Sequence, residues 1–179
     1  DDAYKAVKEF RKNNVKKIIM LTGDREEISK NVSTELKLDK YYAELLPQDK
    51  VKKVEFLMQE KSIDGKLVFI GDGINDAPVL ALSDIGVAMG GLGSDAAIEA
   101  ADIVIMTDEP SKLASAIKIS KKTMQIVKEN IVFAITVKIL VLLLSAIGIA
   151  TMWAAVFADV GVSVIAIINA LRILRVKGD

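Results

Sequence analysis

The composition of this chain limits both its chemistry and its surroundings. Its 179 residues contain 24 Lys and Arg against 24 Asp and Glu, so the formal net charge is zero and no overall field points to nucleic acid. Hydrophobic residues make up 51% of the chain, which is high for a fully soluble protein, so the excess must be concentrated in one region. The absence of Cys and His excludes a disulfide framework, a thiol nucleophile, a zinc finger and a histidine general base within these residues. A metal ion would be held here by oxygen.

The first residues predict that the chain is a piece of a longer protein. It begins Asp1-Asp2-Ala3-Tyr4-Lys5, with no initiator Met and no signal-peptide pattern of basic, apolar and small residues. We therefore expect a cut made inside a larger sequence.

Up to about Glu129, short apolar runs alternate with amphipathic ones. The apolar runs predict strands, and the amphipathic or Ala-rich runs predict helices. The expected strands are 17–21, 67–70, 85–89 and 103–106, and the expected helices are 25–38, 50–60 and 94–101. Strands that are apolar throughout and separated by helices indicate a parallel sheet covered on both faces. In such a sheet, chemistry collects at the carboxyl ends of the strands.

Three polar clusters lie where that rule would place a site. Thr22-Gly23-Asp24 follows the first strand, residues 71–76 follow the second, and Lys50 opens a predicted helix. Each has a plainer interpretation: Asp24 as a helix N-cap, Lys50 as a solvated lysine, and residues 71–76 as a tight turn. Their occurrence together at strand ends of one sheet favours a phosphate and Mg²⁺ site.

The apolar excess lies near the C-terminal end. From Ile131 to Leu171 the only charged residues are Lys138 and Asp159. A helix predicted over 111–129 leads into two apolar stretches, 131–150 and 155–174, each long enough for one transmembrane helix at roughly 20 residues per span. The uncharged Thr151–Ala154 segment between them, which contains a Trp, predicts the turn of a helical hairpin.

Basic residues flank the hairpin on both sides. They are Lys121, Lys122 and Lys128 before the first stretch and Arg172, Arg175 and Lys177 after the second. This distribution predicts that both outer ends are cytoplasmic. A buried helical hairpin of a soluble protein is the alternative, but basic flanks and an interfacial Trp fit lipid better.

The clusters resemble, in order, the haloacid-dehalogenase superfamily pattern of a hydroxyl residue, a lysine and a paired-acid G-D-x-x-x-D. Longer strings are similar to those of P-type ATPases, and within them to the heavy-metal branch that exports zinc, cadmium or lead. These strings are residues 20–24, 46–50, 71–78, 90–97 and 107–112. The resemblance implies an α/β, Rossmann-like (haloacid-dehalogenase-like) domain followed by a transmembrane α-helical hairpin. Residues 1–129 would then be the C-terminal half of the phosphorylation domain with a linker helix, and residues 130–179 the seventh and eighth membrane helices.

The same resemblance implies roles for the polar residues. Asp72 would bind Mg²⁺ and Asp76 would close the acidic site, since oxygen ligands suit this hard ion. Lys50 would neutralise the phosphate as a point charge. Thr22 and the Gly23 amide would bind phosphoryl oxygens, and Asn75 would assist them. Asp24 would orient the nucleotide or the hinge.

Two intramembrane charges suggest the transported ion. Zinc-type pumps have a lysine in the seventh membrane helix and an aspartate in a D-x-G of the eighth, which match Lys138 and Asp159-Val160-Gly161. Copper-type pumps carry Asn, Tyr, Met and Ser instead, and a borderline divalent ion tolerates a carboxylate better than Cu(I) does. Asp159 would therefore bind the transported metal, with Lys138 as its counter-ion. The alternative for Lys138 is snorkelling to the interface.

Several hallmarks of the family are absent from these residues. They include the phosphorylated aspartate in its Asp-Lys-Thr-Gly-Thr string, the nucleotide-binding and actuator domains, and the Cys-Pro-Cys membrane helix. We expect the chain alone to be inactive as an ATPase, and the remainder of the pump and the lipid bilayer to be its partners. The complete multi-pass protein would use ATP and Mg²⁺ in a plasma or inner membrane, with the phosphorylation domain and the C-terminus in the cytoplasm.

The sequence leaves three rival functions open. A membrane-anchored phosphatase of the haloacid-dehalogenase type would need an Asp-x-Asp nucleophile, and none precedes Thr22. A non-catalytic membrane scaffold would have no reason to keep Asp72, Asp76 and Lys50 together. A P-type pump for another ion, such as copper, competes over the substrate only.

Overall fold

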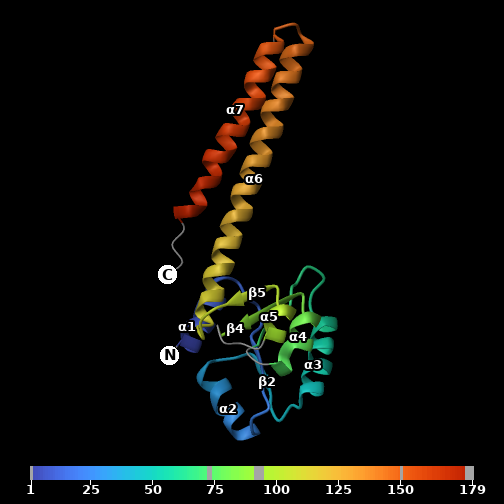
Figure 1. Cartoon of the computed structure of the whole chain (residues 1–179), viewed down its shortest axis with the longest axis vertical. Helices are drawn as coiled ribbons and strands as arrows, with labels where there is room; N and C mark the ends of the chain where they lie inside the picture. Colours follow the sequence, from blue (N-terminus) through green and yellow to red (C-terminus); the bar gives the residue numbers. More distant parts are fainter. Residues whose placement is uncertain (1, 72–73, 91–94, 150, 176–179) are drawn as a thin grey trace. The chain divides into compact units, whose positions relative to one another are not determined.

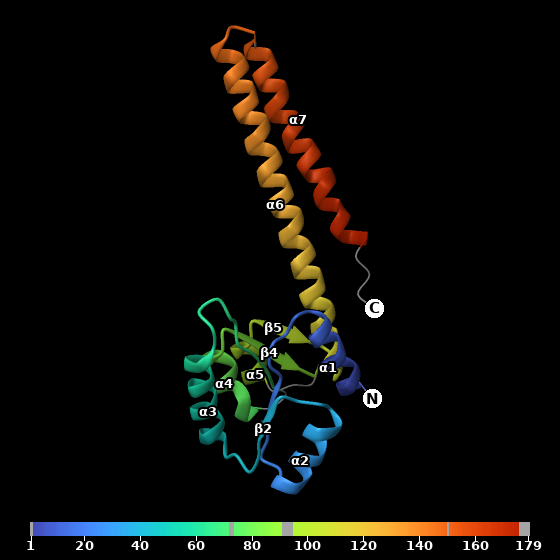
Figure 2. The same cartoon turned by 180° about the vertical axis from the view of Figure 1, so that it is seen from behind.

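The computed structural model describes residues 2–71, 74–90, 95–149 and 151–175 (Figures 1 and 2). The chain divides into two compact units, Asp1–Ala114 and Ser115–Asp179. The functional boundary predicted between residues 129 and 130 lies within a helix of the second unit and stays a prediction. Asp72 and Gly73 lie outside the described residues.

The first unit contains parallel strands connected by helices, which confirms the α/β class. Strand β1 (Ile19–Leu21) pairs with β2 (Lys40–Tyr42), and β3 (Val68–Gly71), β4 (Ile85–Met89) and β5 (Ile103–Ile105) pair in that order. The expectation of one continuous sheet is wrong for the described residues, because β1 and β3 belong to two separate hydrogen-bonded sheets. Strand β2 is an addition to the predicted elements.

Three helices described in this unit correspond to predicted ones and differ from them at their ends, whereas the helices at Asp2–Lys12 and Ala77–Leu82 are additions to the predicted elements. The described helices are α1 (Asp2–Lys12), α2 (Glu26–Glu35), α3 (Pro47–Glu60), α4 (Ala77–Leu82) and α5 (Asp95–Ala100), with a short 3₁₀ turn, η1, at Ile74–Asp76. Helix α3 begins three residues before Lys50 because Pro47 suits the first helical position. Helix α2 ends early because Lys37 takes a positive φ of 55°. Lys50 therefore lies in the first turn of its helix.

A small apolar core holds α4 and α5 against the three-stranded sheet. Leu80, Ala88 and Ala97 are buried together, and the partly buried Phe69 and Val104 pack on them. Helix α4 packs on both α3 and β4, and Figures 1 and 2 show α3 and α4 side by side. This packing fixes the connection from β3 through η1 to α4, where one predicted cluster lies.

The second unit is a helical hairpin. It contains most of α6 (Ser111–Ala146), all of α7 (Met152–Ala170) and the 3₁₀ turn η2 (Leu171–Arg175), and α6 and α7 run side by side (Figures 1 and 2). Among the described residues, one helical segment, Ala155–Arg175, is long and apolar enough to cross a membrane. The other predicted span, 131–150, is helical as part of α6 up to Ala146, and its crossing of a membrane stays a prediction.

The hairpin turn lies earlier than predicted. Gly148 has a φ of +76°, its amide donates to the Ser145 carbonyl at 3.0 Å, and the Ile149 amide donates to Leu144 at 2.9 Å. This pattern is a glycine-based helix C-cap, which ends α6 before the predicted Thr151–Ala154 turn. Trp153 consequently lies in the first turn of α7.

Candidate functional site

The first predicted cluster, Thr22-Gly23-Asp24, forms a closed turn after β1. The Thr22 hydroxyl donates a hydrogen bond to Asp24 Oδ2 at 2.8 Å, and the Asp24 amide donates to Thr22 Oγ1 at 3.1 Å. Asp24 is not the N-cap of α2, because Arg25 occupies that position without a side-chain capping bond. The plainer interpretation of Asp24 is therefore wrong, and its carboxylate orients the Thr22 hydroxyl.

Backbone hydrogen bonds tie this turn to the segment that precedes α3. The Leu45 amide donates to the Thr22 carbonyl at 3.0 Å, and the Glu44 amide donates to the Asp24 carbonyl at 2.9 Å. A Cβ on Gly23 would lie 3.3 Å from the Leu45 carbonyl oxygen, so glycine permits this close approach. The end of β1 and the beginning of α3 are thus held together.

Lys50, in the first turn of α3, reaches across to the residue that ends η1. Its Nζ lies 2.8 Å from Asp76 Oδ1, and the two side chains are 19% and 9% exposed respectively. Hydrogen bonds between two charged groups are stronger than neutral ones, and shielding from water strengthens this one further. Lys50 is not a solvated helix lysine, so that plainer interpretation is also wrong.

Asp76 is tightly placed at the start of α4. It occupies the N-cap position without making a side-chain capping bond, because Oδ1 accepts from Lys50 instead. Its Oδ2 has no protein hydrogen-bond donor within the described ranges. A Cβ on Gly71 would lie 2.8 Å from Asp76 Cβ and 3.0 Å from Oδ2, so only glycine fits at the end of β3 without moving this carboxylate.

The structure therefore brings Lys50 and Asp76 together, and separately Thr22, Gly23 and Asp24. No hydrogen bond or ion pair joins these two groups in the part of the chain that the structure describes. Asn75 lies in η1 and is exposed. Asp72, predicted as the main Mg²⁺ ligand, falls outside the described residues, so its placement stays a prediction.

The two charges that the sequence predicts to lie in the membrane form an ion pair between the hairpin helices. Lys138 Nζ lies 3.1 Å from Asp159 Oδ1, and the two side chains are 63% and 66% exposed in this unit. A lysine that snorkelled to the interface would leave the aspartate alone. The pairing favours the counter-ion interpretation over snorkelling, although the roles of both residues stay predictions.

Comparisons with known proteins agree across nearly the whole chain. Residues 1–84 match the model of the haloacid dehalogenase-like hydrolases. A cadmium, zinc and cobalt-transporting ATPase of Bacillus subtilis (strain 168) is 56% identical over 99% of this chain and 25% of its own length. A zinc-transporting ATPase of Synechocystis sp. is 54% identical over 98% of this chain and 24% of its own length. The crystal structure of a zinc-transporting PIB-type ATPase in the E2.Pi state has a TM-score of 0.87 and 38% identity, over 97% of this chain and 28% of that one.

The chain is thus similar over nearly its whole length to metal-transporting P-type ATPases. It spans about a quarter of the length of the curated relatives it matches.

One residue that supports the candidate site was not predicted from the sequence. Asp84, just before β4, accepts hydrogen bonds from the Leu67 amide at 2.7 Å and from Lys61, while Lys66 lies 3.7 Å away. The Leu67 hydrogen bond, joined by the one from Lys61, lowers the pKa of Asp84. Asp84 thereby joins the end of α3 to the start of β3, the strand that leads to Gly71.

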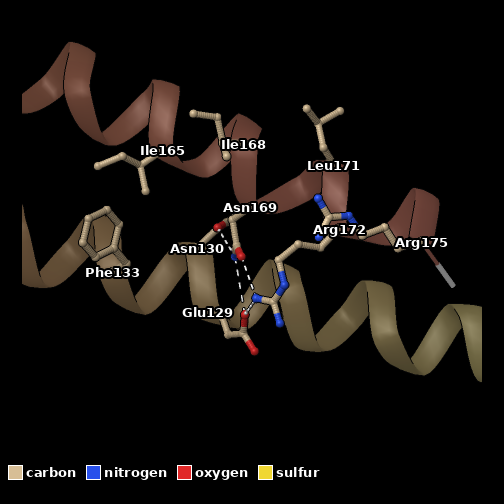
Figure 3. A pocket seen from close by; sticks show the side chains of 9 residues that line it. All are labelled: Glu129, Asn130, Phe133, Ile165, Ile168, Asn169, Leu171, Arg172 and Arg175. Atoms are coloured by element: carbon tan, nitrogen blue, oxygen red, sulfur yellow. Dashed lines mark hydrogen bonds and ion pairs between the residues drawn. The ribbon is translucent and has the colours of Figure 1, made fainter.

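A second unpredicted feature of the chain is a polar cluster in its hairpin (Figure 3). Its members are Glu129 and Asn130 of α6, Asn169 of α7 and Arg172 of η2. They line a pocket of about 590 Å³ whose other walls include the apolar side chains of Phe133, Ile165 and Ile168. These four polar residues come from two distant segments of the sequence and form no periodic pattern in either one. The sequence alone therefore did not indicate that they lie together.

The donor atoms near Asp76 are chemically suited to Mg²⁺. Within the described ranges, no three acidic side chains come together as a metal-binding group. Asp76, four residues after Asp72 in the sequence, nevertheless offers one carboxylate oxygen that accepts no hydrogen bond from the described residues. Mg²⁺ in phosphoryl-transfer sites is usually bound by one or two carboxylates with water and phosphate oxygens, so two acids suffice.

Proposed function

We propose that the full-length protein is an ATP-driven pump that exports a soft divalent metal ion, Zn²⁺, Cd²⁺ or Pb²⁺, through an aspartyl-phosphate. The observation that carries this proposal is the Lys138–Asp159 ion pair in an otherwise apolar hairpin. A carboxylate within a membrane span is costly, and such residues usually mark an ion pathway. Relatives with 54–56% identity are named as transporters of cadmium, zinc or cobalt.

The cytoplasmic residues would stabilise the phosphoryl group during its transfer. Phosphoryl transfer depends mainly on positioning and on charge neutralisation, so a cation and hydrogen-bond donors are needed around the group. Lys50 would supply the positive charge and Thr22 and the Gly23 amide the donors, with Asn75 beside them. Asp24 would hold the Thr22 hydroxyl in place, as its 2.8 Å contact suggests.

Mg²⁺ would be held by Asp72 and Asp76. The bound ion supplies positive charge against the phosphate oxygens. Until nucleotide arrives, Lys50 compensates the charge of Asp76, which keeps a nearly buried carboxylate from being unpaired. Binding of a phosphate would then let Lys50 turn from Asp76 toward the phosphate.

The nucleophilic aspartate would come from the remainder of the pump. The edge of β1 away from β2 and the edge of β3 away from β4 carry no strand within the described residues. Unpaired strand edges accept a further strand readily. A parallel strand between β1 and β3 would end beside the Thr22 turn and the Lys50–Asp76 pair, which is where a nucleophile is needed.

In the membrane, Asp159 would bind the transported metal and Lys138 would replace it when the metal leaves. An exchange of partners of this kind avoids an unpaired carboxylate in lipid at every stage. The basic residues at the outer ends of the hairpin support a cytoplasmic position for the phosphorylation domain and the C-terminus, with both hairpin helices in the membrane.

The test is metal titration of the purified full-length pump with Asp159→Ala, using Zn²⁺ and Cd²⁺ in parallel. We expect loss of high-affinity binding in the membrane and of metal-stimulated ATP hydrolysis. Phosphorylation by inorganic phosphate, which depends on the cytoplasmic site, should persist. Wild-type stoichiometry and affinity in this variant would remove the main chemical support for a soft divalent metal.

A further inference from the structure

The polar cluster of Figure 3 joins the middle of α6 to the C-terminal end of α7 and to η2. Asn130 Nδ2 donates to the Ala166 carbonyl at 3.1 Å, while its Oδ1 accepts from Asn169 Nδ2 at 2.9 Å. Arg172 donates to Glu129 Oε2 at 2.9 Å and to Asn169 Oδ1 at 2.7 Å. Both amide side chains use their donor and their acceptor, so each is tied to a specific partner on the other helix or beside it.

The rest of the contact surface between the helices does little to fix the register of one helix against the other. Val137 and Val141 of α6 and Val162 and Ala166 of α7 are apolar residues that are partly or fully buried on this surface. In lipid, sliding one apolar helix face along another costs little, because acyl chains are as apolar as the partner helix. Polar contacts have discrete partners, so they select one register.

The cluster and the metal-site pair follow the same register. Lys138 lies eight residues after Asn130, and Asp159 lies ten residues before Asn169. At a rise of about 1.5 Å per residue, these separations correspond to roughly 12 Å and 15 Å along antiparallel helices. The mismatch of roughly 3 Å is within the reach of a lysine side chain. With Asn130 opposite Asn169, Lys138 is therefore brought level with Asp159.

We infer that the cluster of Glu129, Asn130, Asn169 and Arg172 is a clamp that sets the register of the hairpin and so positions Asp159 against Lys138. This inference rests on the proposed function, because it assigns positioning residues to the proposed metal site. The clamp touches neither Lys138 nor Asp159 among the described contacts and acts only through the helix register. A slip by one helical turn would move the carboxylate about 5 Å relative to the lysine.

The test uses Asn169→Leu in the full-length pump, because leucine keeps a similar volume and is well tolerated in a membrane helix. We expect Zn²⁺ affinity to fall about tenfold, in line with the usual effect of residues that orient metal ligands. Phosphoenzyme formation from inorganic phosphate should stay within twofold of wild type. Thr136→Val is the matched control, since it removes an exposed hydrogen bond to Val132 within α6 and should change neither quantity.

Two further measurements separate positioning from a general structural role. Double electron–electron resonance would measure the distance between genetically encoded spin labels at positions 140 and 157. The distribution of this distance should shift or broaden in Asn169→Leu and stay unchanged in Thr136→Val. Arg172→Glu should weaken Zn²⁺ binding, and Glu129→Arg added to it should restore at least half of the loss by reversing the ion pair. Unchanged spacing and Zn²⁺ affinity in Asn169→Leu, or no rescue by the reversed pair, would overturn the clamp.

The outcome can be distinguished from failure of the proposed function. If Asp159→Ala abolishes Zn²⁺ binding while Asn169→Leu leaves it intact, the metal site stands and the clamp fails. If Asp159→Ala binds Zn²⁺ as wild type does, the proposed function fails, whereas the spin-label distances still report whether the clamp sets the register.

Discussion

Lys50 Nζ lies 2.8 Å from Asp76 Oδ1, although 26 residues separate them in the sequence. The contact joins the first turn of α3 to the turn that connects β3 with α4. Both side chains are largely shielded from water, so each charge depends on the other for stabilisation. Under the proposed function, this cation is the one that would neutralise the phosphate.

The first prediction concerns Lys50→Met in the full-length pump. The change removes both the counter-charge of Asp76 and the cation for the phosphate, and breaking a shielded ion pair from one side costs about 3–5 kcal/mol. We expect phosphoenzyme formation from ATP to fall by at least about 100-fold, measured with radiolabelled ATP. Lys52→Met, on the same helix with a side chain that is 76% exposed, is the control and should stay within twofold of wild type. Wild-type phosphoenzyme levels in Lys50→Met would refute the assigned role.

Gly71→Ala should damage the same site without replacing a charged residue. The new Cβ would meet Asp76 Cβ at 2.8 Å, so the carboxylate or the end of β3 must move. Because transfer depends on accurate positioning, we expect phosphoenzyme formation to fall at least about tenfold and the Mg²⁺ requirement to rise. Both would be measured by titrating Mg²⁺ during phosphorylation.

Gly86→Ala provides the contrast to that variant. Its Cβ would lie 2.5 Å from the Leu80 carbonyl oxygen, which is a backbone clash between β4 and α4. That variant should lose thermal stability and protein yield, whereas Gly71→Ala should lose activity at nearly normal stability. Equal losses of both properties in the two variants would show that Gly71 matters for folding rather than for the site.

The sequence predicted most of the α/β unit because its apolar runs are strong local signals. The run at residues 67–70 appears as β3, Val68–Gly71, and the run at 85–89 appears as β4. It missed β2 because Lys40-Tyr41-Tyr42 carries a charge and two polar-tipped rings instead of an apolar run. One continuous sheet was expected because local patterns report the existence of strands but not their hydrogen-bonded neighbours.

The candidate site was only partly predictable. Family resemblance singled out Lys50 and Asp76, yet their contact depends on how α3 packs against α4, which no local pattern encodes. Asp84 and Asn169 gave no signal, because a single acid in a loop and a single amide in a helix are common surface residues. Their importance arises from partners that are distant in sequence.

The third prediction uses the pH dependence of Asp84. The pKa of Asp84 in the folded protein is lowered below the unfolded value of about 3.9. The carboxylate therefore contributes fully to the free energy of unfolding above about pH 3.9, and this contribution is lost as the pH falls through the folded pKa. We expect Asp84→Asn to destabilise the domain by about 1–2 kcal/mol at pH 7, since it weakens charged hydrogen bonds to Leu67 and Lys61. The difference in free energy of unfolding between wild type and Asp84→Asn should be constant between pH 7 and pH 5 and should shrink below about pH 4.

Hydrogen exchange of the β3 and β4 amides in the full-length pump would measure this difference. Asp64→Asn is the control, because Asp64 is an exposed acid in the loop before β3. If the loss of stability in Asp84→Asn grew as the pH fell, this result would contradict the pH dependence expected from the lowered pKa.

The last prediction separates the counter-ion role of Lys138 from a role in metal binding. Lys138→Met preserves side-chain length and apolarity but removes the charge that lies 3.1 Å from Asp159. An empty site would then hold an uncompensated carboxylate, which costs several kcal/mol in lipid, so the metal-free state becomes less favourable. We expect Zn²⁺ release to slow about tenfold, followed by stopped-flow fluorescence with a chelating dye, while Zn²⁺ binding persists. Lys138→Arg keeps the charge and should release Zn²⁺ as fast as wild type. Lys128 is an exposed lysine outside the apolar stretch of α6, so Lys128→Met should also leave release unchanged. Wild-type release in Lys138→Met would mean that Asp159 is compensated by another group, and the ion pair would then be a feature of the hairpin rather than part of the transport cycle.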